Sequence, residues 1–346
     1  TMKKIILILI IFLCSGCLDY KEINSLGIIS GIAIEKKDNN YETTYEVVNT
    51  KNNNTEELTS KTYTVTSQGK TFAEALENTN KSLAKEPYFS HIKVVIIDKN
   101  VDILDIADYI LREDNFASNF YLVVSEKPRN ILEFQSKNEP LNSVAILSLL
   151  ETSNYVKLEN SFDYLVAKLM SRVEDITIPE VYIDNEITLG TNYLYQGTSI
   201  KTKLDNNTQT IYNYLTSGKK VLVKDKTNNS IYISNGKLDI KIKNNKILLK
   251  FQAQGLVNYL NDNSNFRNKD TYTKLENTFN SLIKEQIISF INLENENNID
   301  VLGLRKAYYL KYPNKKYQSN ILNNLEIEVH TNIAINRAGS IFEVVK

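Results

Sequence analysis

The sequence is poor in the residues that carry most enzyme chemistry and most covalent cross-linking. Its 346 residues include two cysteines, two histidines, two methionines and no tryptophan. Both cysteines, Cys14 and Cys17, lie near the N-terminus, so the rest of the chain has no disulfide and must be stabilised by its hydrophobic core. About 330 residues are enough for such a core and predict two or three domains.

The chain also lacks an excess of either charge. Removing Lys3 and Lys4 from the 41 basic residues leaves 39, against 41 acidic residues. With this balance the sequence has neither the excess positive charge that attracts nucleic acid nor a polybasic patch that would bind a membrane surface. We therefore expect no nucleic-acid partner.

The N-terminal segment predicts a secretory signal peptide over residues 1–16. Two lysines precede nine apolar residues (5–13), and the small pair Ser15-Gly16 precedes Cys17. At about 1.5 Å per residue the apolar run covers roughly 14 Å, less than half of a hydrocarbon core of ~30 Å. The run is therefore too short to span a bilayer.

Cys17 is the predicted lipidation site. A small-residue pair followed by Cys fits a lipoprotein signal, in which the thiol receives a diacylglyceryl group and acyl chains such as palmitate anchor the protein. The position three before it, usually Leu, is Cys14. The alternatives are a signal peptide cleaved without lipidation and a short buried helix. Each buried methylene contributes ~0.8 kcal/mol, so a multi-chain lipid is expected to hold the protein at the outer face of the cytoplasmic membrane.

Hydrophobic periodicity predicts an N-terminal α/β domain over residues 18–127. Residues 26–35 form a nearly continuous apolar run, which is typical of a strand buried on both faces. Neighbouring segments alternate apolar and polar residues or repeat at helical spacing. The expected strands are 26–35, 41–50, 61–67, 92–98 and 120–124, the expected helices are 70–85 and 101–111, and Asn52–Asn54 is an expected loop.

The remaining chain predicts a mainly helical middle segment, 128–190, which can belong to the first domain, and a C-terminal α+β domain, 191–346. The Asn235-Gly236 pair between alternating apolar runs predicts a hairpin turn, and Asn244-Asn245 the next turn. The expected helices are 131–134, 143–150, 162–170, 271–293 and 301–309, and the expected strands include 193–201, 211–215 and 325–335. The predicted fold class is mixed α/β and α+β, with an N-terminal sheet, a helical middle and a C-terminal β-meander plus long helices.

No pattern of catalytic, metal-binding or cofactor-binding residues emerges. His91 and His330 have no neighbour at metal-ligand spacing. Ser90 and His91 point to opposite sides of an extended segment, which excludes a dyad, and His91 is expected at a strand start. We therefore expect no enzyme activity and no cofactor.

Two further patterns have structural explanations. Gly69-Lys70-Thr71 lacks the earlier glycine of a phosphate-binding loop, so Gly69 is expected to turn the chain into a helix with Thr71 near its first turn. Tyr308, Tyr309 and Tyr312 are expected on a half-buried helix face, the alternative being the lining of a pocket or interface.

Short stretches spread over the mature chain carry a family resemblance. They are Asp19, Glu22-Ile23 and residues 26–34 after the lipid-bearing Cys, then Ser67–Thr71 with Glu74-Ala75, Tyr88–Ile97, Leu111–Glu113, Pro179, Asp300–Leu304, Tyr312-Pro313 and Ile335–Gly339. In this order they resemble the spore germination receptor C-subunit lipoproteins, the Ger(x)C family. Leu18 and Tyr317 stand where that family often has Trp.

The resemblance implies a non-enzymatic role in the inner membrane of the dormant spore. Such proteins act with a polytopic, transporter-like B subunit and an A subunit that combines soluble and membrane parts, in a complex that responds to nutrients and starts ion release. A lipid anchor raises the effective concentration of the protein towards these partners. Whether this subunit contacts a germinant stays open.

Two other function classes stay open at the level of sequence. A solute-binding lipoprotein of a transporter predicts two similar α/β lobes around a cleft, whereas the two halves of this sequence differ. A lipid-anchored cell-wall hydrolase needs a carboxylate pair, a zinc site or a nucleophile–base pair, and none stands out.

Overall fold

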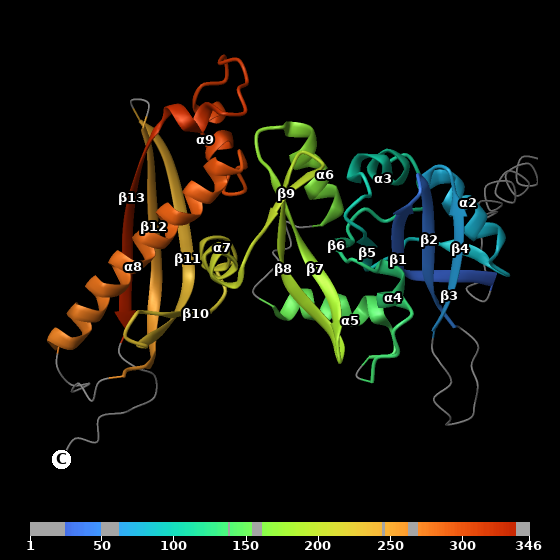
Figure 1. Ribbon diagram of the computed structural model, residues 1–346, viewed down its shortest axis with the longest axis horizontal. Helices are drawn as coiled ribbons and strands as arrows, with labels where there is room; N and C mark the ends of the chain where they lie inside the picture. Colours follow the sequence, from blue (N-terminus) through green and yellow to red (C-terminus); the bar gives the residue numbers. More distant parts are fainter. Residues whose placement is uncertain are drawn as a thin grey trace, which may run out of the picture.

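The computed structural model describes residues 25–49, 62–137, 139–153, 161–243, 246–261 and 269–336. The predicted signal peptide and Cys17 lie outside these ranges, as do Asn52–Asn54, Asn244-Asn245 and Arg337–Gly339. The described chain forms two sheets that follow one another along the long axis of the molecule, with helix α7 (Asn206–Thr216) between them (Figure 1).

The larger sheet has the order β3-β2-β1-β5-β6-β7-β8-β9, with β4 paired to β1. Strands β1, β5, β6 and β7 are parallel neighbours, and the outer strands pair antiparallel. The bounds are β1 (Leu26–Lys37), β2 (Asn40–Val48), β3 (Thr62–Gly69), β4 (Glu86–Tyr88), β5 (Val94–Ile97), β6 (Tyr121–Val124), β7 (Ile176–Asp184), β8 (Glu186–Gln196) and β9 (Ser199–Lys203).

Helices cover both faces of this sheet around its parallel strands. Helices α2 (Phe72–Lys81), α3 (Ile103–Ile110) and α6 (Phe162–Ser171) enclose one core, and α4 (Pro128–Leu132) and α5 (Asn142–Thr152) enclose the other. Ile32 and Ile34 of β1 enter the first core and Ala33 enters the second. The predicted strand buried on both faces is therefore confirmed.

The start of α2 confirms the structural explanation of Gly69-Lys70-Thr71. The Thr71 hydroxyl accepts the Glu74 N–H at 3.1 Å, and the Glu74 carboxylate accepts the Lys70 N–H at 2.8 Å. These reciprocal bonds satisfy backbone groups that a helix start otherwise leaves unpaired. A Cβ at Gly69 would lie 2.3 Å from the Ala75 nitrogen, so the turn into the helix requires glycine.

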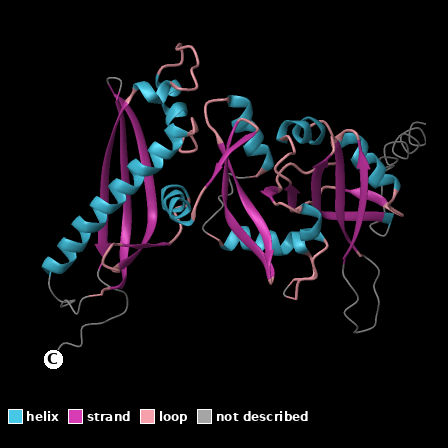
Figure 2. Cartoon of the chain, in the orientation of Figure 1, coloured by secondary structure: helices cyan, strands magenta, loops and turns pink. Residues whose placement is uncertain are grey.

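The smaller sheet has the order β10-β11-β12-β13, and helix α8 runs diagonally across it (Figures 1 and 2). Phe279, Ile283 and Ile287 of α8 are fully buried in the core beneath the helix. The bounds are β10 (Val221–Lys224), β11 (Ser230–Lys243), β12 (Lys246–Tyr259), β13 (Glu326–Asn336), α8 (Lys269–Glu296), α9 (Leu304–Lys311) and the 3₁₀ helix η3 (Ile321–Asn324). The predicted mixed fold class is confirmed.

Two local predictions in this half are wrong. Residues 211–215 lie in α7 and not in a strand, because the Asp205 carboxylate accepts the Thr208 N–H at 2.8 Å and starts a helix five residues earlier. Asn235-Gly236 is a bulge inside the continuous strand β11 and not a hairpin turn. Asn235 does adopt a φ of 54°, so the pair supplies the positive φ that a bulge also uses.

The sequence also missed the strands between residues 176 and 192. Pro179 lies within β7, inside the middle segment that was predicted to be mainly helical, beside a register shift where a strand tolerates a residue without an N–H. The expected strand at 193–201 is divided between β8 and β9 by a turn at Gly197, whose φ is 58°.

Candidate functional site

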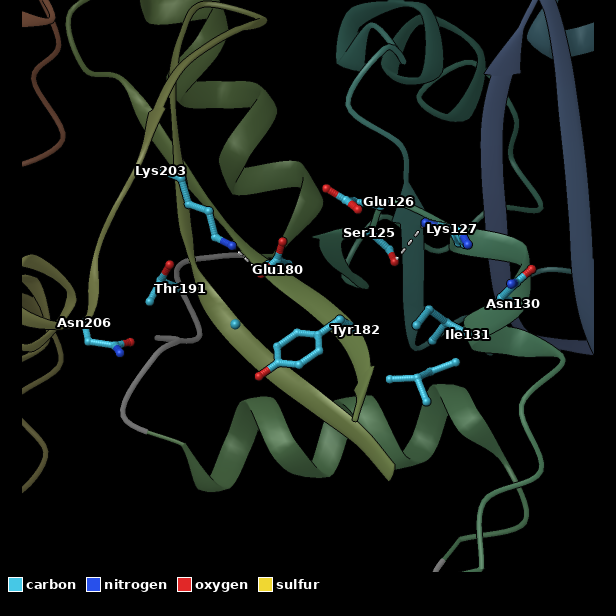
Figure 3. Close-up of a pocket in the computed structure, with 12 residues that line it drawn as sticks. Ser125, Glu126, Lys127, Asn130, Ile131, Glu180, Tyr182, Thr191, Lys203 and Asn206 are labelled. Atoms are coloured by element: carbon cyan, nitrogen blue, oxygen red, sulfur yellow. Dashed lines mark hydrogen bonds and ion pairs between the residues drawn. The ribbon is translucent and has the colours of Figure 1, made fainter. Parts of the chain in front are cut away.

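A pocket of about 680 Å³ opens at the carboxyl end of β6. It is lined by the start of α4 and by residues of β7, β8 and β9 (Figure 3). After β5 the chain passes to α3 on one face of the sheet, and after β6 it passes to α4 on the other. Ligands of α/β proteins bind outside the carboxyl ends of strands at such a divergence, so this pocket is a candidate binding site.

Glu180 is the central charged group of the pocket. It is buried, and its carboxylate accepts the Tyr193 hydroxyl at 2.9 Å and the Lys203 ammonium at 2.6 Å. Lys203 also lies 5.3 Å from the centre of the Tyr193 ring, and Lys99 lies 5.2 Å from it. The Tyr193 hydroxyl and then Glu126 raise the pKa of Lys99 to about 12. The carboxylates Glu180 and Glu126 are thus each paired with a lysine.

Charged and polar side chains make up most of the pocket lining. The Ser125 oxygen accepts the Lys127 N–H at 3.3 Å, and no histidine lines the pocket among the described residues. Over the same ranges, no group of three or more His, Cys, Asp or Glu residues is placed to hold a metal ion.

A second group of buried charged residues lies where the start of β7 meets the turn between α8 and α9. We name Asp175, Glu294, Asp300 and Arg305 the junction cluster. The side chain of Arg305 is 2% exposed, that of Asp175 is 8% exposed and that of Asp300 is fully buried. Glu294 is buried as well. Asp175 precedes β7 of the larger sheet, whereas the other three residues belong to α8, α9 and the turn between them.

Arg305 is the one cation of the cluster. Its Nη2 donates to the Asp175 carboxylate, and its Nε lies 3.6 Å from an Asp300 oxygen. Its Nη1 donates to the Tyr317 hydroxyl at 3.3 Å and to the Ser319 carbonyl at 3.2 Å. The guanidinium therefore ties the larger sheet to the segment that follows α9.

The carboxylates of the cluster shape the turn from α8 to α9. Glu294 accepts the N–H groups of Val301 at 2.7 Å and Leu302 at 3.0 Å. Asp300 accepts those of Leu304 at 2.8 Å and Arg305 at 2.7 Å, which starts α9. Helix α9 begins at Leu304, three residues later than the sequence predicted, and Gly303 before it adopts a φ of 80°.

Burial raises the pKa values of these carboxyl groups. The pKa of Asp300 rises to about 6, and that of Glu294 rises well above its usual range through burial and the neighbouring Asp300. Burial also raises the pKa of Asp175, although Arg305 opposes that shift. At Glu174, next in sequence, burial is outweighed by Lys168 and Lys306, which lower the pKa.

The two histidines singled out from the sequence line neither site, whereas the tyrosines lie on or just after α9, the helix that carries Arg305. His91 lies in the turn between β4 and β5 and not at a strand start, and the Ser90 hydroxyl donates to the Asn115 carbonyl at 3.3 Å. His330 is exposed on β13, with its Nε2 2.7 Å from a Glu328 oxygen. The rings of Tyr308, Tyr309 and Tyr312 pack against one another on α9, which confirms the half-buried helix face.

Two family models match the chain in sequence. One, described as the spore germination protein N-terminal domain, matches residues 19–183, and the other, described as spore germination B3/GerAC like, C-terminal, matches residues 188–339. The chain belongs to the Ger(x)C family of spore germination proteins. The resemblance seen in the sequence is thereby confirmed.

Individual members of this family match to different extents. Spore germination protein KC of Bacillus subtilis (strain 168) is 20% identical over 395 aligned positions, which cover 98% of this chain and 96% of that protein. Spore germination protein B3 of the same organism is 25% identical over 163 positions, which cover 44% of this chain and 42% of that protein.

A solved structure supports the fold. The crystal structure of the GerBC protein superposes with a TM-score of 0.52 at 14% identity, covering 88% of this chain and 96% of that one. At this identity the likeness supports the architecture of both halves and no more. Within the described ranges, no helix is long and apolar enough to cross a membrane.

Proposed function

We propose that this protein is the lipid-anchored C subunit of a nutrient germinant receptor in the spore inner membrane. It acts without catalysis, through contacts with the membrane-bound A and B subunits, to trigger germination. Membership of the Ger(x)C family over both halves of the chain, residues 19–183 and 188–339, is the observation that carries the proposal.

The position of Cys17 supports a close membrane tether. Strand β1 begins at Leu26, so residues 18–25 connect the predicted lipid to the larger sheet. Eight residues reach at most roughly 29 Å. A lipid on Cys17 therefore keeps the start of β1 within about that distance of the outer membrane face, where the A and B subunits are expected.

The architecture argues against the alternative of a solute-binding lipoprotein. That function favours two similar lobes, whereas one half here has a mixed sheet with helices on both faces and the other has four strands with α8 on one face. The paired state of Glu180 and Glu126 likewise gives no support to a hydrolase, which needs a carboxyl group free to act as acid or base.

The deciding experiment is germination of spores that lack this gene and all paralogous receptors. We expect the nutrient response to be absent and the response to non-nutrient triggers to be intact, with the wild-type gene restoring the former. Cys17→Ala is expected to fail in restoring it. Cys14→Leu, which introduces the residue usual at that position, is the matched control and is expected to restore germination fully.

Normal germination of the deleted strain on every nutrient tested would remove the receptor role and favour the solute-binding alternative. Full restoration by Cys17→Ala would remove the lipid anchor from the mechanism and leave the receptor role in place.

A further inference from the structure

The junction cluster holds more negative than positive groups in a space withdrawn from water. Three carboxyl groups, of Asp175, Glu294 and Asp300, surround the single guanidinium of Arg305. If all were ionised, the buried cluster would carry two uncompensated negative charges. Burying unpaired charge is strongly unfavourable, so protons must be held there.

The hydrogen bonds indicate where a proton is held. Glu294 Oε1 already accepts two backbone N–H groups, whereas Glu294 Oε2 is buried without a hydrogen-bond partner in the described chain. A proton on Oε2 neutralises the one carboxyl group of the cluster whose side chain makes no ion pair. The raised pKa values of Glu294 and Asp300 agree with this arrangement.

The cluster also joins parts of the chain that are far apart in sequence. The Asp175 N–H donates to the Asp300 carbonyl at 2.9 Å, and the Asp300 N–H donates to the Asp175 carboxylate at 2.9 Å. Next to these bonds, Glu174 pairs with Lys168 at 2.6 Å and with Lys306 at 3.0 Å. Two consecutive acidic residues before β7 thus face two consecutive basic residues on α9.

Other contacts hold the two halves together near α7, independently of the cluster. The hydroxyl groups of Thr177 and Tyr212 are 3.0 Å apart, and Leu194 of β8 is buried in the core of the smaller sheet. Loss of the cluster would therefore release the α8–α9 corner while α7 keeps the halves connected.

We propose that the junction cluster is a proton-operated clasp between the larger sheet and the α8–α9 corner, closed while Glu294 holds a proton and opened when this proton is lost. The clasp is a property of this chain alone and does not depend on the proposed receptor role.

Electrostatics explains how proton loss opens the clasp. Ionised Glu294 and Asp300 repel each other and Asp175, and Arg305 compensates only one of the three charges. Asp300 is the member that moves, because it both accepts the first N–H groups of α9 and binds Asp175 through two reciprocal bonds. The other charged groups around the cluster, Glu174, Lys168 and Lys306, already pair among themselves.

A cavity reaches one side of the cluster. It has a volume of about 310 Å³ and is lined by Asp175 and Arg305 together with Gln196 and Tyr317. The same cavity gives Asp175 and Arg305 room to hydrate when the clasp opens.

The test is a distance measurement by pulsed electron paramagnetic resonance on the mature lipoprotein in detergent. Met170 on α6 and Leu310 on α9 are 70% and 75% exposed, so spin labels on Met170→Cys and Leu310→Cys report across the junction without disturbing a core. Between about pH 5 and about pH 9 we expect the single narrow distance peak of the closed state to be lost as the pH rises.

Two glutamate variants decide the origin of that change. Glu294→Gln keeps the shape of the side chain without a titrating group and is expected to retain the narrow peak over the whole range. Glu296→Gln, at an exposed position near the end of the same helix, is expected to behave like the wild type.

A wild-type distribution that does not change with pH would overturn the proposal, and this result requires no variant. The proposal also fails if Glu294→Gln folds and still shows the wild-type pH dependence. Either result leaves the germination experiment on the receptor role unaffected.

Discussion

A Cβ atom at Gly190 would lie 2.1 Å from Glu180 Oε2, which is closer than any two non-bonded atoms can approach. Glu180 and Gly190 face each other across the β7–β8 pair, and the missing side chain is what leaves room for the carboxylate to reach Tyr193 and Lys203. The position of the Glu180 carboxylate in the pocket at the carboxyl end of β6 therefore depends on the absence of a side chain at residue 190.

Gly190→Ala is expected to displace Glu180 and to destabilise the protein by about 1–3 kcal/mol, the usual cost of overpacking a filled site. Urea unfolding measures the change. Gly27→Ala is the matched control, because a Cβ there meets its nearest neighbour at 3.6 Å, an ordinary contact. Equal stability of the two variants would contradict the close approach at Gly190.

The sequence predicted those parts of the fold in which burial is continuous along the chain. Residues 26–35 and 92–98 were predicted as strands because nearly every residue in them is apolar, and β1 and β5 bury both of their faces. A short sequence pattern predicted the local structure less well where the same residues fit two different structures. Asn235-Gly236 supplies a positive φ, which fits a bulge as well as a hairpin, and the register of β11 with β12 decides between them.

The candidate sites could not be predicted, because tertiary packing assembles them. Asp175 and Arg305 lie 130 residues apart, and neither belongs to a pattern that marks it as buried. Asp300 and Gly303 did stand in a stretch that carries the family resemblance. The structure gives that stretch a physical role, since the Asp300 carboxylate accepts the N–H groups of Leu304 and Arg305 at the start of α9 and Gly303 adopts a φ of 80° immediately before it.

Replacing Arg305 by Met is expected to destabilise the protein by about 3–5 kcal/mol. The change leaves Asp175 and Asp300 buried without their cation, and an uncompensated buried charge costs that much. Chemical denaturation monitored by circular dichroism measures it. Lys306→Met is the matched control on the next residue, where a half-exposed ion pair with Glu174 contributes only about 0–1 kcal/mol. The prediction is wrong if both variants lose the same stability.

Asp300 is expected to make stability fall as pH rises. Its pKa is raised from 3.8 to about 6 in the folded state, so its contribution is fully present below about pH 3.8 and is lost as the pH passes about 6. The size of the effect is about 3 kcal/mol at 1.36 kcal/mol per pKa unit. Glu174 acts in the opposite direction, because a lowered pKa contributes stability that is lost as pH falls.

Comparison of the wild type with Asp300→Asn separates these two contributions. The free energy of unfolding of both proteins is measured from about pH 4 to about pH 8. The variant is expected to be less stable overall and to lack the decline that Asp300 causes in the wild type. Parallel curves for the two proteins would show that Asp300 does not titrate in this range.

Asn280 of α8 protects the outer edge of β13. Its side-chain oxygen accepts the Ile333 N–H at 2.8 Å and its side-chain nitrogen lies 3.4 Å from the Ile333 carbonyl, so one amide takes the place of a neighbouring strand. Glu276 accepts the Ile335 N–H at 2.9 Å in the same way. An exposed strand edge is a template for pairing with another chain, and α8 covers this part of it.

Asn280→Leu is therefore expected to have two effects. Stability falls by about 1–3 kcal/mol, because the Ile333 backbone groups lose their partner, and self-association through β13 increases. Denaturant unfolding measures the first effect and light scattering against protein concentration the second. Asn277→Leu, at an exposed position on the same helix, adds the same apolar surface without uncovering the edge. Association that rises equally in both variants would assign the effect to apolar surface and not to the strand edge.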